Sequence, residues 1–150
     1  ALVEADESME TMILFSMNGN DRYAIRLSEV TRLEEFNVSQ IEQSAGQDVI
    51  QYRDELLSLV RLGDVLGVMT LDEGSDRIPA IVFSRHGKSL GVVVGRIIDI
   101  VEAKMHLHVS PAGKIGVKGS LIIEGTSTDL LDIEQLIECV VPGWMDTVGV

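Results

Sequence analysis

The sequence is short of the residues that mark disulfide-stabilised, secreted and nucleic-acid-binding proteins. Its single cysteine, Cys139, excludes an internal disulfide and is typical of a reducing compartment. Aromatic residues make up 4% of the chain, which is too few for a surface that stacks bases. Lys and Arg number 12 against 24 Asp and Glu, and the net charge of −12 repels phosphate backbones and anionic lipid surfaces. We therefore expect a cytoplasmic protein with no nucleic-acid partner.

Long apolar runs are also missing. The longest runs, such as Ile78 to Phe83 and Gly91 to Gly95, are far shorter than a membrane span, and no basic segment with an apolar core opens the chain. Direct membrane insertion is therefore not expected. In this interpretation residues 1–9 are an acidic lead or linker, residues 10–138 form the folded domain, and residues 139–150 are a C-terminal linker.

The apolar residues that are present favour strands. Val (18) and Ile (14) together outnumber Leu (16) and Ala (7), and β-branched side chains suit a pleated sheet better than a helix. Hydrophobic residues make up 45% of the 150 positions, enough for a domain of ordinary size to fold without disulfides or metal.

An internal repeat is the most informative feature of the sequence. Met12-Ile-Leu-Phe15-Ser16-Met-Asn-Gly19 recurs 68 positions later as Ala80-Ile-Val-Phe83-Ser84-Arg-His-Gly87. Two further blocks of apolar positions recur in the same order, 25–33 at a shift of 67 and 59–66 at a shift of 71. Any two hairpins with Gly turns are somewhat alike, but three blocks in one order favour a duplicated unit of about 70 residues.

The two units, roughly 10–70 and 78–138, have the same predicted order of strands. Each opens with a strand, a turn containing Gly and a return strand, followed by an extended segment and a second pair of short strands. Tyr23, Ile25 and Leu27 alternate as in a strand with one buried face. Strands this short curl into small barrels. The predicted fold class is all-β, with two small five-stranded β-barrels packed around a shared hydrophobic core, and exchange of strands between them is left open.

Helices have a minor part in this prediction. Asp132 can cap a short helix with one apolar face, which Pro142 and Gly143 end. Ser39 begins a second short helix that Gly46 ends.

No arrangement of residues indicates catalysis or a cofactor. Gly87-Lys88-Ser89 lacks the first glycine of a phosphate loop, because Val82 stands in that place. His106 and His108, with His86, could chelate a metal, but no cluster of Cys or carboxylates completes four ligands. We therefore expect no metal, no cofactor and no enzymatic activity in the domain itself.

The ordered set of motifs resembles the CheW-like domain of bacterial chemotaxis signalling. In the first unit the matching segments are Tyr23-Ala-Ile25, Val49-Ile-Gln-Tyr-Arg53 and Leu56-Leu-Ser-Leu-Val-Arg-Leu62. In the second unit they are Leu90-Gly-Val-Val-Val94, Gly119-Ser120 and Leu130-Leu-Asp-Ile133. The resemblance covers roughly residues 10–138 and implies two small β-barrels around a shared core.

Two kinds of protein carry this domain, the free adaptor CheW and the C-terminal regulatory domain of the histidine kinase CheA. The Asn-Leu-Arg-Gly turn usual in the adaptor is absent, and Phe36-Asn-Val-Ser-Gln-Ile41 is similar to the kinase version. The tail from Ile137 to Trp144 resembles the segment that precedes a fused receiver domain in hybrid kinases. The resemblance favours the kinase domain, which implies a non-catalytic scaffold between the rest of the kinase chain, a CheW-type adaptor and the cytoplasmic tip of chemoreceptors, at membrane-associated receptor arrays.

Three residues match the family surface that meets a receptor or partner: Val30, Arg32 and Arg53. The resemblance implies that Arg53 binds a partner carboxylate as a fork, whereas the residues alone favour a solvated arginine at a strand edge. Contacts between barrels should be partly apolar, so we expect binding that persists in raised salt.

The sequence also departs from the family at Asp54, Ser58 and Gly95, where Gly, Pro and Asp are usual. These departures put in doubt the shape of the turn at Asp54 and any role of a carboxylate at position 95. The alternatives are a free CheW-type adaptor and a small β-barrel module that binds a peptide or ligand.

Overall fold

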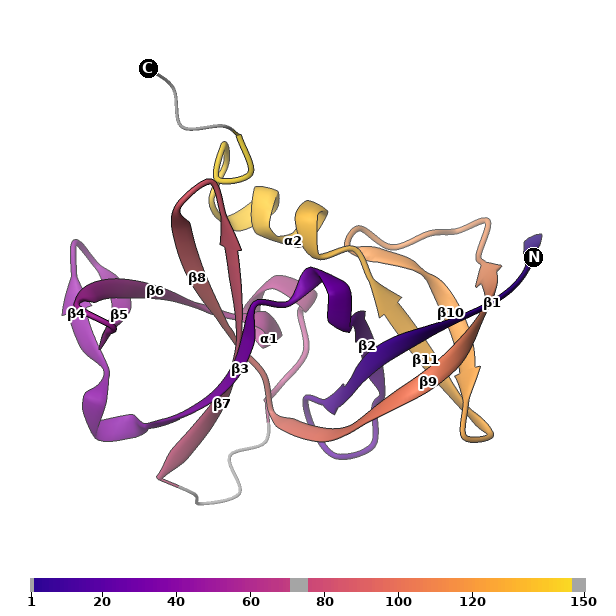
Figure 1. Cartoon of the computed structure of the whole chain (residues 1–150), viewed down its shortest axis with the longest axis horizontal. Helices are drawn as coiled ribbons and strands as arrows, with labels where there is room; N and C mark the ends of the chain where they lie inside the picture. The colour runs from indigo at the N-terminus through magenta and orange to yellow at the C-terminus, as the bar shows by residue number, and fades with distance from the viewer. Residues whose placement is uncertain (1, 71–75, 147–150) are drawn as a thin grey trace.

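The computed structural model describes residues 2–70 and 76–146, with side chains from residue 8 onward. The described residues are mostly β, as predicted. The strands are β1 (Leu2–Ser16), β2 (Tyr23–Arg26), β3 (Arg32–Asn37), β4 (Glu42–Ser44), β5 (Gln47–Tyr52), β6 (Glu55–Arg61), β7 (Arg77–Arg85), β8 (Lys88–Val93), β9 (Arg96–Val109), β10 (Val117–Ile123) and β11 (Thr126–Leu131). The α-helices are α1 (Leu62–Leu66) and α2 (Ile133–Val140), and Figure 1 shows α2 lying across the place where two sheets meet.

Five strands form a closed barrel in the order β1-β2-β11-β10-β9. β1 pairs antiparallel with β2 and β9, β2 runs parallel to β11, and β10 joins β11 to β9. All five strands contribute to the interior of this barrel. The buried residues there are Met12, Leu14, Ala24, Ala103, Met105, Leu107, Leu121, Ile123 and Leu130.

The other six strands form a second sheet in the order β3-β7-β8-β6-β5-β4. Its pairing repeats that of the closed barrel, since β7 is antiparallel to β3 and β8, β8 is parallel to β6, and β6 is antiparallel to β5. The difference lies in the long strand: β9 pairs with both of its neighbours, whereas its counterpart is split into β3 and β4. The ring of backbone hydrogen bonds is therefore open between β3 and β4.

A 3-10 turn, η2 (Val38–Gln40), makes this break. The Asn37 Oδ1 accepts the backbone N–H of Ser39 at 3.0 Å, and the Gln40 Oε1 accepts the backbone N–H of Asn37 at 2.8 Å. This capping box satisfies two backbone donors that a continuous strand would have placed in the ladder. The second short helix expected from Ser39 to Gly46 is therefore wrong, because only one turn forms before the chain enters β4.

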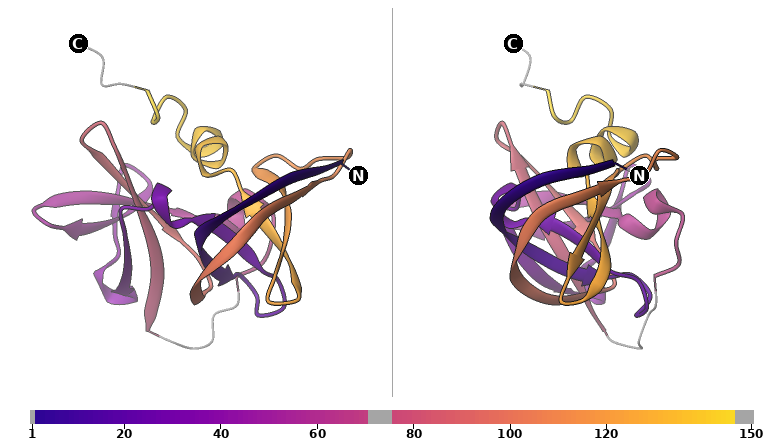
Figure 2. Two further views of the ribbon diagram at one scale, coloured as in Figure 1. Left: turned by 45° about the vertical axis from the view of Figure 1, so that its right-hand side comes forward. Right: turned by 90° about the vertical axis from the view of Figure 1, so that its right-hand side faces the viewer.

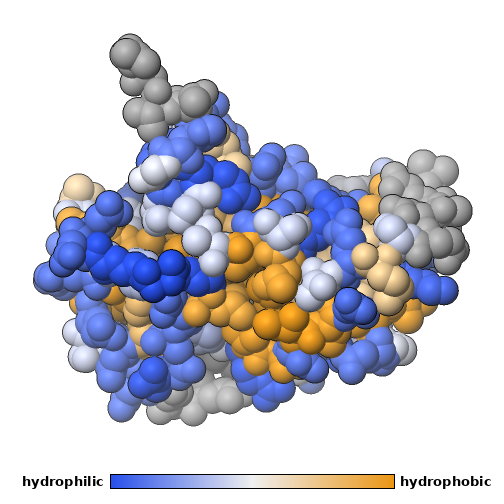
Figure 3. Space-filling view, in the orientation of Figure 1, coloured by the Kyte–Doolittle hydropathy of each residue, from blue (hydrophilic) through white to orange (hydrophobic). Residues whose placement is uncertain are grey.

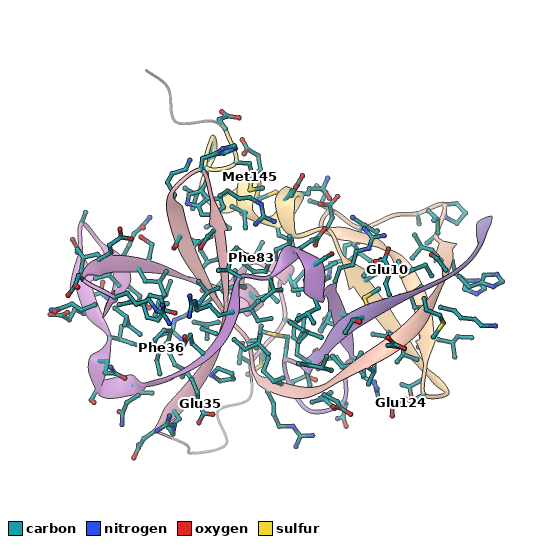
Figure 4. The ribbon with its side chains drawn as sticks, in the orientation of Figure 1. Glu10, Glu35, Phe36, Phe83, Glu124 and Met145 are labelled. Carbon is teal, nitrogen blue, oxygen red and sulfur yellow. The ribbon has the colours of Figure 1, made fainter. Side chains whose placement is uncertain are left out.

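Each half of the chain gives its opening hairpin to the sheet of the other half. β1 and β2 complete the barrel of β9 to β11, and β7 and β8 complete the sheet of β3 to β6. A shared core lies where the sheets meet, and Phe15 and Phe83, which are equivalent in the sequence repeat, are both fully buried in it. Figure 2 shows the two sheets side by side, and Figure 4 places Phe83 between them.

Gly95 lies on the connection between β8 and β9, beside the end of β1. A Cβ atom at this position would lie 2.5 Å from the carbonyl oxygen of Met17 and 2.6 Å from that of Ser16. No side chain fits there, so the Asp that is usual in the resembled family is excluded by packing.

The chain beyond β11 ties the closed barrel to the second sheet. Asp132 caps α2 by accepting the backbone N–H of Gln135 at 3.1 Å, as the sequence predicted. After α2 the chain turns back, and Trp144 is buried in the shared core. The Lys88 Nζ, at the start of β8, donates to the Trp144 carbonyl oxygen at 2.5 Å and lies 5.5 Å from the centre of its ring.

The two ends of the expected domain therefore have structure of their own. Residues 2–5 of the expected acidic lead pair with β9, and residues 139–146 of the expected linker continue α2 and carry Trp144. Residues 1 and 147–150 lie outside the described part of the chain. The sequence did not predict α1, whose five residues follow β6 directly and end at Gly67 in the left-handed conformation.

Candidate protein-interaction site

Val30 lies where the chain enters β3. It follows the 3-10 turn η1 (Leu27–Glu29), and its backbone N–H donates to the Leu27 carbonyl oxygen at 3.0 Å. The side chain is half-buried against the shared core. Val30 therefore supports the core with one side and leaves the other open to a partner.

β3 carries charged residues on the side that faces the core of the second sheet. The register pairs Arg32 with Val82 and Glu34 with Ala80, and paired residues of antiparallel strands lie on the same face. Val82 and Ala80 are buried in the second core. Charged residues are rare at such positions, so Arg32 and Glu34 need an explanation.

Tyr52 joins the two sides of the second sheet. It is the last residue of β5, and its Oη donates to the Glu34 Oε1 on β3 at 2.7 Å. Its ring meets the ring of Phe36, also on β3, edge to face, with the centres 5.8 Å apart. Figure 4 shows Phe36 enclosed by the curled second sheet. Side chains thus close the gap that the backbone leaves open at η2.

Arg53 lies in the turn between β5 and β6. Its guanidinium carbon is 5.4 Å from the centre of the Tyr52 ring, a cation–π distance. Arg53 and Asp54 have φ values of 52° and 64°. These values lie in the left-handed region, which residues other than glycine rarely adopt. Despite the missing glycine, the turn at Asp54 therefore has the conformation of a tight two-residue hairpin.

The pKa of the Tyr52 hydroxyl depends on Glu34, Arg53 and Arg32. Burial raises its pKa most, and the hydrogen bond and charge of Glu34 raise the pKa further. A hydrogen bond from Arg53 and the positive charge of Arg32 lower the same pKa, because both stabilise a phenolate. Tyr52 therefore contacts Arg53 in its own turn and Glu34 on β3, the strand that carries Arg32, whereas Val30 packs at the shared core.

A groove of about 710 Å³ runs along the side of the second sheet where β9 begins. Apolar residues of four strands line it, among them Leu33, Pro79, Val93 and Ile97, and arginines lie at positions 61, 77 and 96. Figure 3 shows an apolar area on the face where β3 and β9 approach each other. Ile100 on β9 is 47% exposed, which is unusual for so large an apolar side chain.

The residues considered for a metal lie elsewhere. His106 and His108 project from one face of β9 with parallel rings whose centres are 5.6 Å apart. Within the described ranges no group of three or more His, Cys, Asp or Glu could hold a metal ion. Neither described helix has the length and apolar character needed to cross a membrane.

Comparison with known proteins decides the family. The profile of the CheW-like domain matches residues 11–140. The chain belongs to the CheW-like domain family. A curated relative, the sensor histidine kinase CheAY of Helicobacter pylori strain ATCC 700392 / 26695, is 33% identical over 120 residues, which is 77% of this chain. The chain spans only 15% of the length of that kinase.

A solved structure supports the same fold for this CheW-like domain. The crystal structure of the scaffolding protein TtCheW from Thermoanaerobacter tengcongensis superposes with a TM-score of 0.68, covering 87% of this chain and 94% of that one. The two share 14% identity, so this likeness concerns the fold alone. A CheW-like domain is a scaffolding and coupling domain of chemotaxis signalling.

Sequence reasoning missed Glu34, Phe36 and Tyr52, whose contacts join β5 to β3, the strand that carries Arg32. A signal was present, since Arg32, Glu34 and Phe36 alternate with Leu33 and so share one face of a strand. The pairing of β3 with β7 was needed to show that this face looks toward a core.

Proposed function

We propose that this CheW-like domain is the regulatory and scaffolding domain of a CheA-type chemotaxis histidine kinase. It couples the kinase to a CheW-type adaptor and to chemoreceptors through protein–protein contacts. The observation that carries the proposal is the 33% identity to a sensor histidine kinase over 120 residues. The fold alone does not separate the kinase domain from a free adaptor, because the adaptor TtCheW shares it.

The proposed contact surface includes Val30, Arg32 and Arg53. Support comes from the half-buried position of Val30 against the shared core, from the exposed position of Arg32 on β3, and from the contact of Arg53 with the Tyr52 ring. Apolar contacts provide most of the binding in this proposal, and the arginines add orientation.

We also propose that the domain consists of two similar subdomains, roughly 10–70 and 78–138, that have exchanged hairpins. The common pairing scheme of the two sheets supports this division. So does the equivalence of Phe15 and Phe83 in the shared core.

Co-sedimentation with a CheW-type adaptor and with a chemoreceptor cytoplasmic fragment tests the proposed function. The domain should pellet with each partner, in low and in raised salt, because burial of apolar area is not screened. Val30→Lys should weaken binding about tenfold, which corresponds to about 1.4 kcal/mol. Ile115→Lys is the matched control, since Ile115 is 68% exposed in the loop before β10.

The result also separates the alternatives. Binding to neither partner, together with a small molecule or peptide bound by the domain, would favour a ligand-binding module. A free adaptor would also bind the receptor fragment in this assay, so the assay does not separate it from a kinase domain. The flanking coding sequence does: a kinase domain is encoded in the same chain as an ATPase domain, whereas a free adaptor is not.

A further inference from the structure

Two histidines on the closed barrel have no part in the proposed contact surface. His106 and His108 lie two residues apart on β9, and their rings are parallel, with the centres 5.6 Å apart. Both side chains are half-buried. Within the residues that the structure describes, neither ring takes part in a hydrogen bond. The ring nitrogens are therefore open to solvent or to a ligand.

The backbone that carries these two histidines is held from two sides. Met105 and Leu107 alternate with them along β9 and are buried inside the closed barrel, so both imidazoles project from its outer face. On the neighbouring strand β10, Gly119 approaches so closely that a Cβ atom there would lie 2.6 Å from the His108 carbonyl oxygen. Only the side-chain torsions of the two histidines remain to be ordered when a ligand binds, which keeps the cost of binding low.

The spacing of the two rings fits one shared metal ion. A zinc ion bound by an imidazole nitrogen lies about 2.1 Å from that nitrogen, and so about 3.2 Å from the centre of the ring. Two rings that bind one ion at a tetrahedral angle have centres about 5.3 Å apart, close to the 5.6 Å observed. The ring planes differ by only 9°, so each ring must turn about its Cβ–Cγ bond to point a nitrogen at the ion. That torsion is broad in histidine, and the backbone need not move.

We propose that His106 and His108 form a bidentate site for a divalent transition metal ion of the kind represented by Zn²⁺, Ni²⁺ and Cu²⁺. The site goes beyond the proposed function and does not depend on it. Imidazole nitrogen is a ligand that suits these ions, whereas Mg²⁺ and Ca²⁺ take oxygen ligands. The described residues supply no third His, Cys, Asp or Glu to the site, so it is an open one, in which water completes the coordination.

The charges near the site partly oppose one another. Lys104 follows the same alternation on the outer face of β9 and repels a cation. The net charge of −12 attracts divalent cations to the surface as a whole. Electrostatics therefore provides little of the binding at this place, and chelation by two imidazoles on one strand provides most of it. The second imidazole binds within the same molecule, which strengthens binding about a hundredfold over a single ligand.

Calorimetric titration of the chain, prepared without a histidine tag, tests the site. Zn²⁺, Ni²⁺ and Cu²⁺, each titrated as the chloride, should bind at one ion per chain, with Cu²⁺ the tightest of the three. His106→Ala and His108→Ala should each weaken binding about a hundredfold, because either change leaves a single imidazole. Mg²⁺ should give no heat beyond dilution.

The third histidine of the chain provides the matched control. His86 is exposed in the turn between β7 and β8, with φ 53°. His86→Asn removes an imidazole and keeps a residue that tolerates the left-handed region, so metal binding should not change. Urea denaturation without metal should give wild-type midpoints for the two β9 variants. A loss of metal binding then reports on ligation and not on folding.

The outcomes decide the site without any protein partner, so its failure leaves the proposed function standing. Equal binding by the wild type and by the His106→Ala, His108→Ala double variant overturns the site. A loss in only one of the two single variants overturns chelation by the pair. One ion per two chains, or a comparable loss with His86→Asn, overturns a site formed by these two histidines within one chain.

Discussion

The closed barrel and the second sheet follow one pairing scheme but differ in how they close. In the barrel, β9 spans 14 residues and completes the ring of backbone hydrogen bonds. In the second sheet, η2 interrupts the corresponding strand, and Tyr52 and Glu34 join the two sides through a single side-chain hydrogen bond. The closed barrel is joined by backbone hydrogen bonds, whereas the open sheet is joined by side chains next to the proposed contact residues Arg32 and Arg53.

The turns at the ends of the two sheets repeat this difference. In the closed barrel the turn after β10 is Glu124-Gly125, with the left-handed second position occupied by glycine. In the second sheet the turn after β5 is Arg53-Asp54, with no glycine. The equivalent turn is relaxed in one sheet and strained in the other, and the strained one carries a proposed contact residue.

The largest effect is expected where the start of β9 lies beside the end of β1. Gly95→Asp would place a charged side chain against the backbone carbonyl oxygens of Met17 and Ser16, at 2.5–2.6 Å for the Cβ alone. We expect a loss of about 3 kcal/mol or more in the free energy of unfolding, measured by urea denaturation. Gly113→Ala, where the nearest atom lies at 3.8 Å, should change little. A tolerated Gly95→Asp would mean that the start of β9 is not packed against the end of β1 as described.

The second effect concerns the tail that ties the closed barrel to the second sheet. Trp144→Ala should lower the free energy of unfolding by about 3 kcal/mol, because it removes a large side chain from the shared core. Lys88→Ala should cost less, about 0.5–1 kcal/mol, since it removes a cation–π contact at the edge of the structure. Trp144 is the single tryptophan, so its fluorescence reports directly on this contact. An emission typical of a fully hydrated indole in the native protein would contradict the docked tail.

The third prediction concerns the second residue of the two equivalent turns, where glycine is introduced in one sheet and removed in the other. Asp54→Gly should stabilise the domain by about 0.5–1 kcal/mol, because glycine adopts positive φ without strain. Gly125→Ala should destabilise it by about 1 kcal/mol, because φ is 73° at this position and alanine is strained there. No atom lies within 4 Å of the added Cβ, so the effect comes from the backbone conformation and not from a clash. Thermal unfolding of both variants measures the pair. If both variants shifted the unfolding temperature in the same direction, the two turns would not differ in backbone strain.

The smallest effect is a dependence of stability on pH at the β1–β2 hairpin. Burial alone would raise the pKa of Asp21, but hydrogen bonds from the backbone of Asn18 and Met17 and from the Ser16 hydroxyl lower it overall. The folded state therefore favours the carboxylate, and this contribution is present above the unfolded pKa, near 3.9, and is lost as the pH falls through the lower folded value. Asp21→Asn should unfold with a weaker dependence on pH in this range, measured by urea denaturation at several pH values. An unchanged dependence would contradict the role of these hydrogen bonds.

Local pattern predicted the strands well. The alternation of Tyr23, Ile25 and Leu27 and the Gly turns predicted the hairpins, and the match of Phe15 with Phe83 indicated a duplicated unit. In the structure both residues lie in the shared core. The all-β fold class and the family were predicted correctly. The break at η2 was not, because the capping residues Asn37 and Gln40 suit the start of a helix and a single 3-10 turn equally.

The site was only partly accessible from the sequence. Arg53 and Arg32 were selected by resemblance, but the hydrogen bond of Tyr52 to Glu34 could not be predicted, because β3 and β5 are not backbone neighbours in the sheet. The close approach at Gly95 also depends on tertiary packing, and the sequence reported it only as a departure from the family. Periodicity describes single strands, and both features arise between strands that are distant in the chain.

Calorimetric titration of the domain with a chemoreceptor cytoplasmic fragment tests the central claim most directly. The account predicts saturable binding that survives raised salt, weakens on Val30→Lys and is unaffected by Ile115→Lys. Heats that do not exceed dilution, for the receptor fragment and equally for a CheW-type adaptor, would contradict it.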